Sequence, residues 1–181
     1  GFGVGGYCLT KDPIFAKIAA KEIFNLPNHE FHFSSTAVEV NKKMPLVIAD
    51  KIKKYFGGSL QGIDILLLGV TYRQDVGDTR FSPSETFLNA ARSENANVSV
   101  YDPMVDDWEG VDISLEKKLP NANDYDVVVF AVKHKEFKKI DLSLWANNSK
   151  VLIFDGNNVL SRDQRSDIKN YNLNYLSIGR G

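Results

Sequence analysis

The first thirteen residues, GFGVGGYCLTKDP, combine residue types that could perform nucleophilic chemistry. Four glycines in six positions let the backbone adopt positive φ and approach a ligand closely. Cys8, the only cysteine, follows at once, with Lys11 and Asp12 three and four residues later. If a helix begins near Asp12, its positive end would stabilise a Cys8 thiolate. The pattern predicts a reactive cysteine beside a bound substrate; a small buried cysteine is the alternative.

A second candidate site follows the first long apolar run, at Tyr72, Arg73 and Arg80. The two guanidinium groups can each donate paired hydrogen bonds to phosphate oxygens. The Tyr72 ring can stack on a base or pack on a sugar. These residue types suit an anionic ligand. The alternative is an ordinary loop whose arginines pair with nearby carboxylates, Asp75 and Asp78.

Three segments, in order along the chain, resemble one family of enzymes. They are the cysteine loop already quoted, LGVTYRQDVGDTRFSP at residues 68–83 and IFDGNNVL at residues 153–160. Together they are similar to motifs of the UDP-glucose/GDP-mannose dehydrogenases, the NAD-dependent nucleotide-sugar 6-dehydrogenases. The sequence resembles the central helix and the C-terminal, nucleotide-sugar-binding domain of that family.

The resemblance implies oxidation of a C6 alcohol to an acid, with NAD as the cofactor. NAD would take a hydride from the alcohol, and the Cys8 thiolate would add to the resulting aldehyde. Oxidation of the thiohemiacetal by a second NAD would give a thioester, and hydrolysis would release the uronic acid. Cys8 is therefore the expected nucleophile, and Asp12 is expected to orient or activate the water.

The same resemblance assigns the other site residues. Arg73 stands at a position for substrate binding where the family usually has lysine. The planar guanidinium group of arginine there replaces the single ammonium of lysine. Contacts to NAD are expected from Lys11 and Arg80. Asn157 and Asn158 stand where relatives often carry arginine, which leaves the identity of the sugar open. The expected substrate-binding residues are Phe2, Gly3, Gly5, Gly6, Tyr72 and Arg73.

Composition narrows the class of partner. The 181 residues carry 22 Lys+Arg and 23 Asp+Glu, a net charge of -1, so no basic field points to nucleic acid or an anionic membrane. A single cysteine excludes an intrachain disulfide, which suits a reducing cytoplasm. No apolar run approaches the ~20 residues that span a bilayer. His29 and His32 lie three residues apart without a further ligand cluster, so no metal site is expected.

The chain is expected to form two parts, residues 1–57 and residues 58–181. The first should hold the cysteine loop, a helix from Asp12 to Phe24 and a longer helix beginning at a capping box, Thr36–Glu39. Pro45 should bend that longer helix or end its first turns. Because the family uses this helix as its dimer core, the resemblance implies a homodimer.

The second part alternates apolar runs with helix-prone stretches. Near-continuous Val, Ile and Leu predict a parallel sheet covered on both faces, and hence a doubly wound, Rossmann-like α/β domain. Ser82 should cap its first helix, with Pro83 in the first turn. His134 is expected in a solvated loop or at a helix start. The expected strands are residues 63–68, 98–101, 127–132, 151–154 and 175–178, and the expected helices are residues 82–92, 134–145 and 161–171.

The sequence holds no strand followed by a GxGxxG loop, so the family's N-terminal NAD-binding Rossmann domain is expected to be absent from this chain. The chain is interpreted as a fragment that turns over no substrate by itself. The expected substrate is a UDP-hexose of the UDP-glucose or UDP-N-acetylmannosamine type. Two alternatives stay open: a non-catalytic nucleotide-binding or interaction module, and the GDP-mannose branch of the family.

Overall fold

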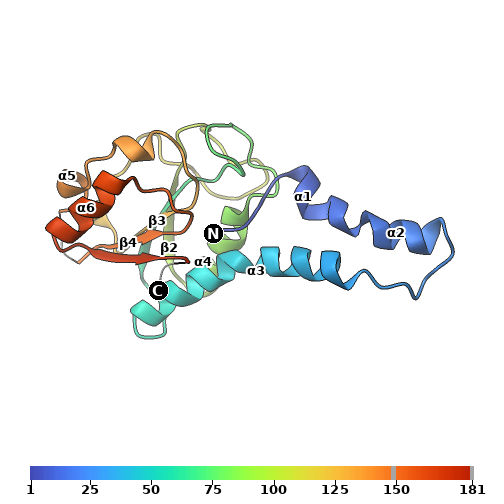
Figure 1. Cartoon of the computed structure of the whole chain (residues 1–181). Coiled ribbons are helices and arrows are strands. Elements are labelled where there is room, and N and C mark those ends of the chain that lie inside the picture. Colours follow the sequence, from blue (N-terminus) through green and yellow to red (C-terminus); the bar gives the residue numbers. More distant parts are fainter. Residues whose placement is uncertain (148–149, 180–181) are drawn as a thin grey trace.

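A parallel sheet forms the centre of an α/β unit, and a long helical hairpin extends from its side (Figure 1). The computed structural model describes residues 1–147 and 150–179. Its strands are β1 (Asp64–Leu68), β2 (Asn97–Tyr101), β3 (Val127–Phe130), β4 (Leu152–Asp155) and β5 (Asn174–Ser177). Its α-helices are α1 (Tyr7–Lys11), α2 (Phe15–Glu22), α3 (His32–Tyr55), α4 (Pro83–Ser93), α5 (Leu142–Trp145) and α6 (Arg162–Asn170). Short 3-10 helices are η1 (Asp12–Ile14), η2 (Ala122–Asp124) and η3 (Phe137–Lys139).

The strand order is β2-β1-β3-β4-β5, and every neighbouring pair is parallel. Leu68 at the end of β1 lies beside Tyr101 of β2 and Phe130 of β3. The apolar runs form such a sheet because both of its faces are covered, so neither face needs polar residues. The predicted doubly wound, Rossmann-like α/β fold is confirmed.

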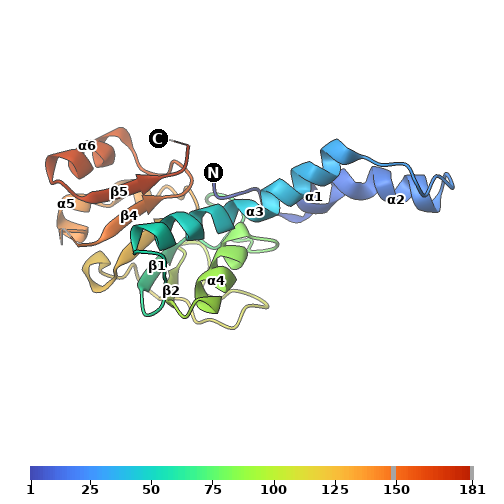
Figure 2. The same ribbon diagram turned by 90° about the horizontal axis from the view of Figure 1, so that it is seen from below.

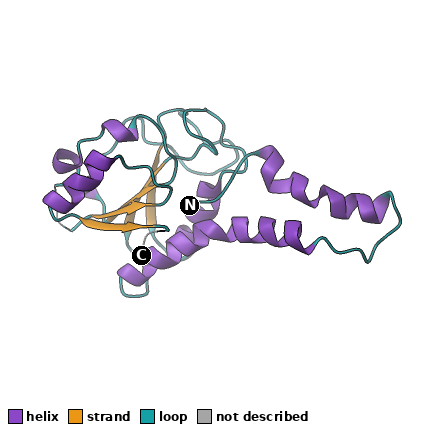
Figure 3. Cartoon of the chain, viewed as in Figure 1, coloured by secondary structure: helices purple, strands orange, loops and turns teal. Residues whose placement is uncertain are grey.

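Successive residues of each strand pack on opposite faces of the sheet. Ile65 and Leu67 of β1 belong to a core shared with α3 and α4, whereas Leu66 and Leu68 belong to a core shared with α5 and α6. Figure 2 shows α3 and α4 lying side by side, with α6 on the other side of the strands. Every residue of β3 and β4 is buried between the two layers of helices, whereas the edge strands β2 and β5 are partly exposed. Figure 3 shows the helices on both sides of the sheet and the loops that connect them to the strands.

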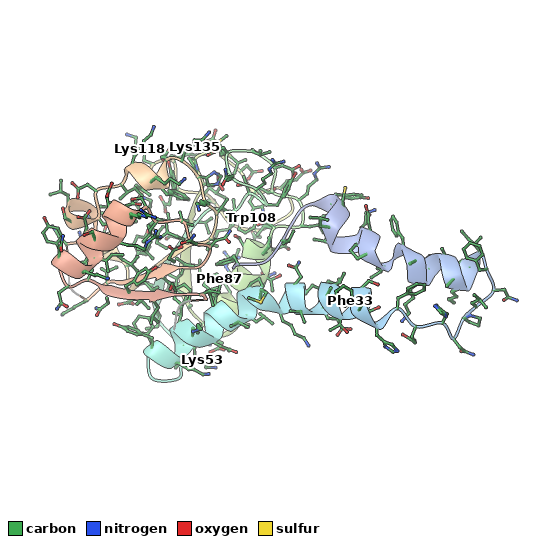
Figure 4. All side chains as sticks on the ribbon, viewed as in Figure 1. Phe33, Lys53, Phe87, Trp108, Lys118 and Lys135 are labelled. Atoms are coloured by element: carbon green, nitrogen blue, oxygen red, sulfur yellow. The ribbon has the colours of Figure 1, made fainter. Side chains whose placement is uncertain are left out.

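Helix α3 belongs both to the projecting hairpin and to the core of the α/β unit. It begins at His32, four residues before Thr36. The predicted capping box therefore lies inside the helix and does not cap its start. Pro45 is buried and lies inside the helix, so it does not end the first turns, which was one of the two outcomes expected for it. Ile52, in the last turns, is fully buried in the core that also contains Phe87 of α4 (Figure 4).

Two other predicted helices are interrupted. The segment from Asp12 to Phe24 forms η1 and then α2, because the backbone turns at Lys11 and Pro13 starts a new 3-10 turn. Residues 134–145 form only η3 and the short α5. Helix formation restarts at Asp141, whose Oδ1 accepts hydrogen bonds from the N–H groups of Ser143 and Leu144.

The hairpin formed by α2 and the first half of α3 projects away from the sheet in both ribbon views (Figures 1 and 2). Apolar side chains on it face solvent; Phe33, labelled in Figure 4, is 90% exposed. The other exposed apolar residues of the hairpin include Ile18, Ile23, Phe24 and Val40. The projection therefore presents an apolar surface that the chain itself does not cover.

Candidate functional site

A cavity of about 170 Å³ lies where the loops after β1 and β3 separate. In the order β2-β1-β3 the chain leaves these two neighbouring strands in opposite directions, and ligands of doubly wound folds bind at this switch point. The cysteine loop and the first turn of α4 close the cavity. Its lining residues are Phe2, Gly3, Thr71, Tyr72, Arg73, Gln74, Pro83, Ser84, Ala131, Val132, Lys133 and Asn157.

Two cations face this cavity, Arg73 and Lys133. In the part of the chain that the structure describes, neither side chain pairs with a carboxylate or donates a hydrogen bond. Gln74 and Asn157 add amide groups to the same walls. Lys133 was not among the predicted site residues, although its place directly after a buried strand could have pointed to it. The cavity therefore suits an anionic ligand with additional polar groups.

The cysteine loop is pressed against Tyr72, and two of its glycines make this approach possible. A Cβ atom on Gly6, whose φ is +85°, would lie 2.8 Å from the Tyr72 ring. A Cβ atom on Gly5 would lie 2.6 Å from the carbonyl oxygen of Phe81. The Gly6 N–H donates to the carbonyl of Arg80 at 3.2 Å. The glycines predicted to cradle a substrate thus have a packing requirement of their own.

Asn41 of α3 fastens the same loop from the opposite side. Its Oδ1 accepts a hydrogen bond from the Val4 N–H, and its Nδ2 donates to the Val4 carbonyl, both at 2.7 Å. One amide side chain therefore satisfies both backbone groups of Val4, as a neighbouring strand would. Four residues beyond Asn41, Pro45 has no N–H for the Asn41 carbonyl. The loop approaches that oxygen, since a Cβ on Gly3 would lie 3.3 Å from it.

Cys8 is exposed and lies in the first turn of α1, not before a helix that begins at Asp12 as predicted. The Lys11 ammonium does not bond to the thiol; it pairs with Asp12 Oδ1 at 3.3 Å. It also lies over the rings of Tyr7 and Phe15, 4.3 Å and 4.6 Å from their centroids. The predicted catalytic pair Cys8 and Asp12 thus occupies a surface segment outside the lining of the cavity.

Arg80 also lies outside the cavity, with Asp78 as its partner. Its Nη2 is 2.6 Å from Asp78 Oδ2, and its Nε donates to the same carboxylate. These side-chain hydrogen bonds lower the pKa of Asp78 from its ordinary value. The alternative considered for this loop had both arginines paired with carboxylates, and for Arg80 that pairing is present. Asp75, however, pairs with Lys135 at 3.4 Å and not with Arg73.

His134 is fully buried, so its predicted place in a solvated segment is wrong. Its Nε2 lies 3.1 Å from Oδ2 of Asp102, a buried residue that follows β2. The same oxygen accepts the N–H groups of Val70 and Thr71, at 2.7 Å and 3.0 Å. Burial alone would raise the pKa of Asp102, but the hydrogen bonds from His134 and from these N–H groups outweigh it and lower the pKa.

Comparison with known proteins agrees with this geometry. The profile of the UDP-glucose/GDP-mannose dehydrogenase family, UDP binding domain, matches residues 66–162, more than half of the chain. The UDP-N-acetyl-D-mannosamine dehydrogenase of Pyrococcus horikoshii is 33% identical to the whole of this chain, which covers 40% of that protein. The chain belongs to the UDP-glucose/GDP-mannose dehydrogenase family.

Two other dehydrogenases are also similar over nearly the whole of this chain. The UDP-glucose 6-dehydrogenase of Rickettsia conorii is 26% identical over 99% of this chain and 41% of its own length. The solved structure of an NDP-N-acetyl-D-galactosaminuronic acid dehydrogenase from Methanosarcina mazei superimposes with a TM-score of 0.82 at 26% identity, over 99% of this chain and 39% of that one. The chain spans about 40% of the length of the relatives it matches.

Within residues 1–147 and 150–179, no three His, Cys, Asp or Glu side chains gather where they could hold a metal ion. None of the helices in these ranges is both long and apolar enough to cross a membrane.

Replacing Gly6 with alanine should release the cysteine loop from Tyr72. A positive φ costs an alanine about 1–2 kcal/mol, and the new Cβ would also overlap the ring. Gly57→Ala is the matched control, because Gly57 has a φ of +77° and open space around it. We expect Gly6→Ala to lower the free energy of unfolding in urea more than Gly57→Ala. Equal losses in the two variants would contradict the packing role of Gly6.

The depressed pKa of Asp102 makes the stability of the fold depend on pH. A carboxylate whose pKa is lower in the folded state stabilises the fold above its unfolded pKa of about 3.9, and this contribution is lost at lower pH. Asp102→Asn should therefore unfold at lower urea concentration than the unchanged chain at pH 7. The difference between the two urea midpoints should become smaller as the pH falls below about 4. A difference independent of pH from 7 to 3 would show that the charge of Asp102 contributes nothing.

Proposed function

We propose that this chain is the C-terminal part of an NAD-dependent nucleotide-sugar 6-dehydrogenase and that its cavity binds the nucleotide of a UDP-hexose. The observation that carries the proposal is the pair of cations, Arg73 and Lys133, that face one cavity and have no carboxylate partner among the residues that the structure describes. A diphosphate would supply the missing negative charge, and the guanidinium fork of Arg73 fits two of its oxygens. The UDP-binding profile that covers this region supports uridine as the nucleoside.

The other walls of the cavity suit the remaining parts of a nucleotide sugar. The half-buried Tyr72 ring offers an apolar surface to a base or a sugar. Gln74 and Asn157 offer amide donors and acceptors to hydroxyl or carbonyl groups. UDP-glucose and UDP-N-acetylmannosamine are both compatible with this lining, and the relatives whose names carry these sugars support either one.

The cysteine loop connects the cavity to the proposed nucleophile. Gly3 lines the cavity and Cys8 lies five residues further on, so the chain between them spans at most about 18 Å. A nucleotide held in the cavity can therefore direct its sugar along the loop toward the exposed thiol. The loop is held at Val4 by Asn41 and at Gly6 by the Arg80 carbonyl, which keeps this path in one place.

At the thiol, the proposed chemistry uses Cys8 and Asp12. The Cys8 sulfur adds to the C6 aldehyde, forming a C–S bond while the carbonyl oxygen takes a proton. Bound NAD would supply the oxidising power by accepting hydride from C6 twice, once as the alcohol becomes the aldehyde and once as the thiohemiacetal becomes the thioester. Water then attacks the thioester carbon, the C–S bond breaks, and the thiol recovers its proton. Asp12 lies four residues from Cys8 and its side chain is 44% exposed, so its carboxylate, paired with Lys11 through Oδ1, is still accessible to that water.

The residues present fit only a small part of an NAD site. Lys11 and Arg80 are the proposed contacts, and each now pairs with the carboxylate of a neighbour, Asp12 or Asp78. An incoming cofactor phosphate could replace either carboxylate. The loop after β1 has no GxGxxG sequence to bring a helix N-terminus against a pyrophosphate. The main cofactor contacts are therefore assigned to a separate domain, and the chain alone is expected to be inactive. The cytoplasm is the proposed location of the whole enzyme.

The projecting hairpin is the proposed homodimer surface. Phe33 and Val40 of α3 are two of its exposed apolar side chains. The hairpin itself extends away from the α/β unit (Figure 1). A second copy related by a two-fold axis would bury the same residues on both chains. Sedimentation should give a dimer at micromolar concentration that Val40→Glu dissociates. Leu144→Glu, at a site 73% exposed on α5, should leave the dimer intact.

Calorimetric titration of the chain with UDP, GDP and UDP-sugars tests the nucleotide proposal. We expect binding selective for uridine, weakened at least tenfold by Arg73→Ala and by Lys133→Ala through loss of charge on the diphosphate. Arg92→Ala is the control, because Arg92 lies in the last turn of α4, at the end away from the cavity. Preference for GDP would favour the GDP-mannose branch. No binding of any nucleotide would remove the proposal for this cavity.

The catalytic role of Cys8 separates an enzyme from a binding module. In a longer protein that carries both this chain and an NAD-binding domain, Cys8→Ser should abolish formation of the sugar acid. A serine hydroxyl has no evident base beside it here and is a poor nucleophile. UDP affinity should not change, because Cys8 does not line the cavity. Full activity in the serine variant would rule out the thioester route.

A further inference from the structure

The loop that carries Tyr72 and Arg73 is held from beneath by a buried polar network. Thr71 Oγ1 lies 3.0 Å from His134 Nε2 and 3.2 Å from Asp102 Oδ2. It also lies 3.2 Å from the carbonyl oxygen of Arg73. Thr71, Asp102 and His134 are all buried and come from the loops after β1, β2 and β3. The network thus joins three loops directly under one wall of the cavity.

The hydrogen bonds determine which nitrogen of His134 carries its proton. The backbone N–H of Asp75 points at His134 Nδ1, with the two nitrogens 3.0 Å apart. An N–H can only donate, so Nδ1 must be the unprotonated acceptor. Nε2 then carries the hydrogen and donates to Asp102 Oδ2 or to Thr71 Oγ1. Because His134 carries its proton on Nε2, the Thr71 hydroxyl does not have to donate to His134 and can donate to the Arg73 carbonyl.

Asp75 occupies a backbone conformation that needs such support. Its φ is +56°, in the left-handed region that non-glycine residues rarely adopt. Its N–H is bound by His134, and its Oδ1 accepts the N–H of Lys135 at 3.0 Å. The turn from Thr71 to Asp75 is therefore held at both ends by residues 134 and 135, and Arg73 lies in its middle.

We infer that His134, as the neutral Nε2–H tautomer, is the positioning residue that holds the turn of Arg73 and Tyr72 against the cavity. It accepts the Asp75 N–H with one ring nitrogen and bonds to Asp102 and Thr71 with the other. His134 itself does not line the cavity, so it acts on a ligand only through the turn. Its effect on nucleotide affinity rests on the function proposed above; its tautomer and its hold on Asp75 do not.

The tautomer is tested without any nucleotide. Long-range ¹⁵N–¹H spectra of the chain with labelled histidine should show one ring whose Nε2 is protonated and whose Nδ1 accepts a hydrogen bond at pH 7.5. The signal is assigned by its loss in His134→Gln. Exchange of the Asp75 amide hydrogen should be at least tenfold faster in that variant. A protonated Nδ1, or unchanged exchange at Asp75, would overturn the inference.

The positioning role is tested by UDP titration of folded variants. His134→Gln can still donate one N–H to Asp102, so its affinity should fall less than that of His134→Phe, for which we expect at least a tenfold loss. His29→Gln replaces an exposed histidine of the hairpin and should change neither affinity nor exchange at Asp75. Unchanged affinity in a folded His134→Phe chain would overturn the role. If the unchanged chain binds no nucleotide, the proposed function fails, and the tautomer and exchange measurements alone decide.

Discussion

The buried Asp102 carboxylate holds together the loops from which the cavity is built. Loops at the carboxyl end of a parallel sheet leave backbone N–H groups that no strand satisfies. Asp102 accepts three of them, from Val70, Thr71 and Met104, as well as the side chain of His134. A buried carboxylate is unfavourable unless hydrogen bonds compensate for its desolvation. Each loop therefore depends on the other two being in place.

The cysteine loop is attached to the same core by a different kind of contact. Phe2 is buried, and its ring packs against Phe87 with centroids 5.6 Å apart. It also fits over Gly156, where a Cβ would lie 2.6 Å from the ring. The loop is therefore anchored in the apolar core at Phe2 and by hydrogen bonds to Asn41 at Val4. These two anchors give the exposed Cys8 a defined place relative to the cavity.

The sequence pattern predicted the sheet well because burial of both faces leaves a direct trace in composition. All five apolar runs became parallel strands, and Ser82 caps α4 as expected, with its Oγ accepting the N–H of Ser84. The start of α3 was missed because the local signal at Thr36 is overruled by a helix already running from His32. Pro45 is also accommodated inside that helix, at a buried position, where a local rule expects a bend or an end.

The candidate site was only partly predictable, because polar residues at strand ends do not reveal which way they point. Lys133 and His134 are neighbours in the same loop, yet one faces the cavity and the other is buried beneath it. Their roles follow from the partners that the fold supplies. Asp102 and the Asp75 N–H bind the imidazole, whereas within the described ranges no carboxylate pairs with the ammonium of Lys133. A residue without a partner in the folded chain is available to a ligand, and a residue with several partners can only shape the site. This distinction separates Arg73 and Lys133, which would bind the diphosphate, from His134, which would hold Arg73 in position.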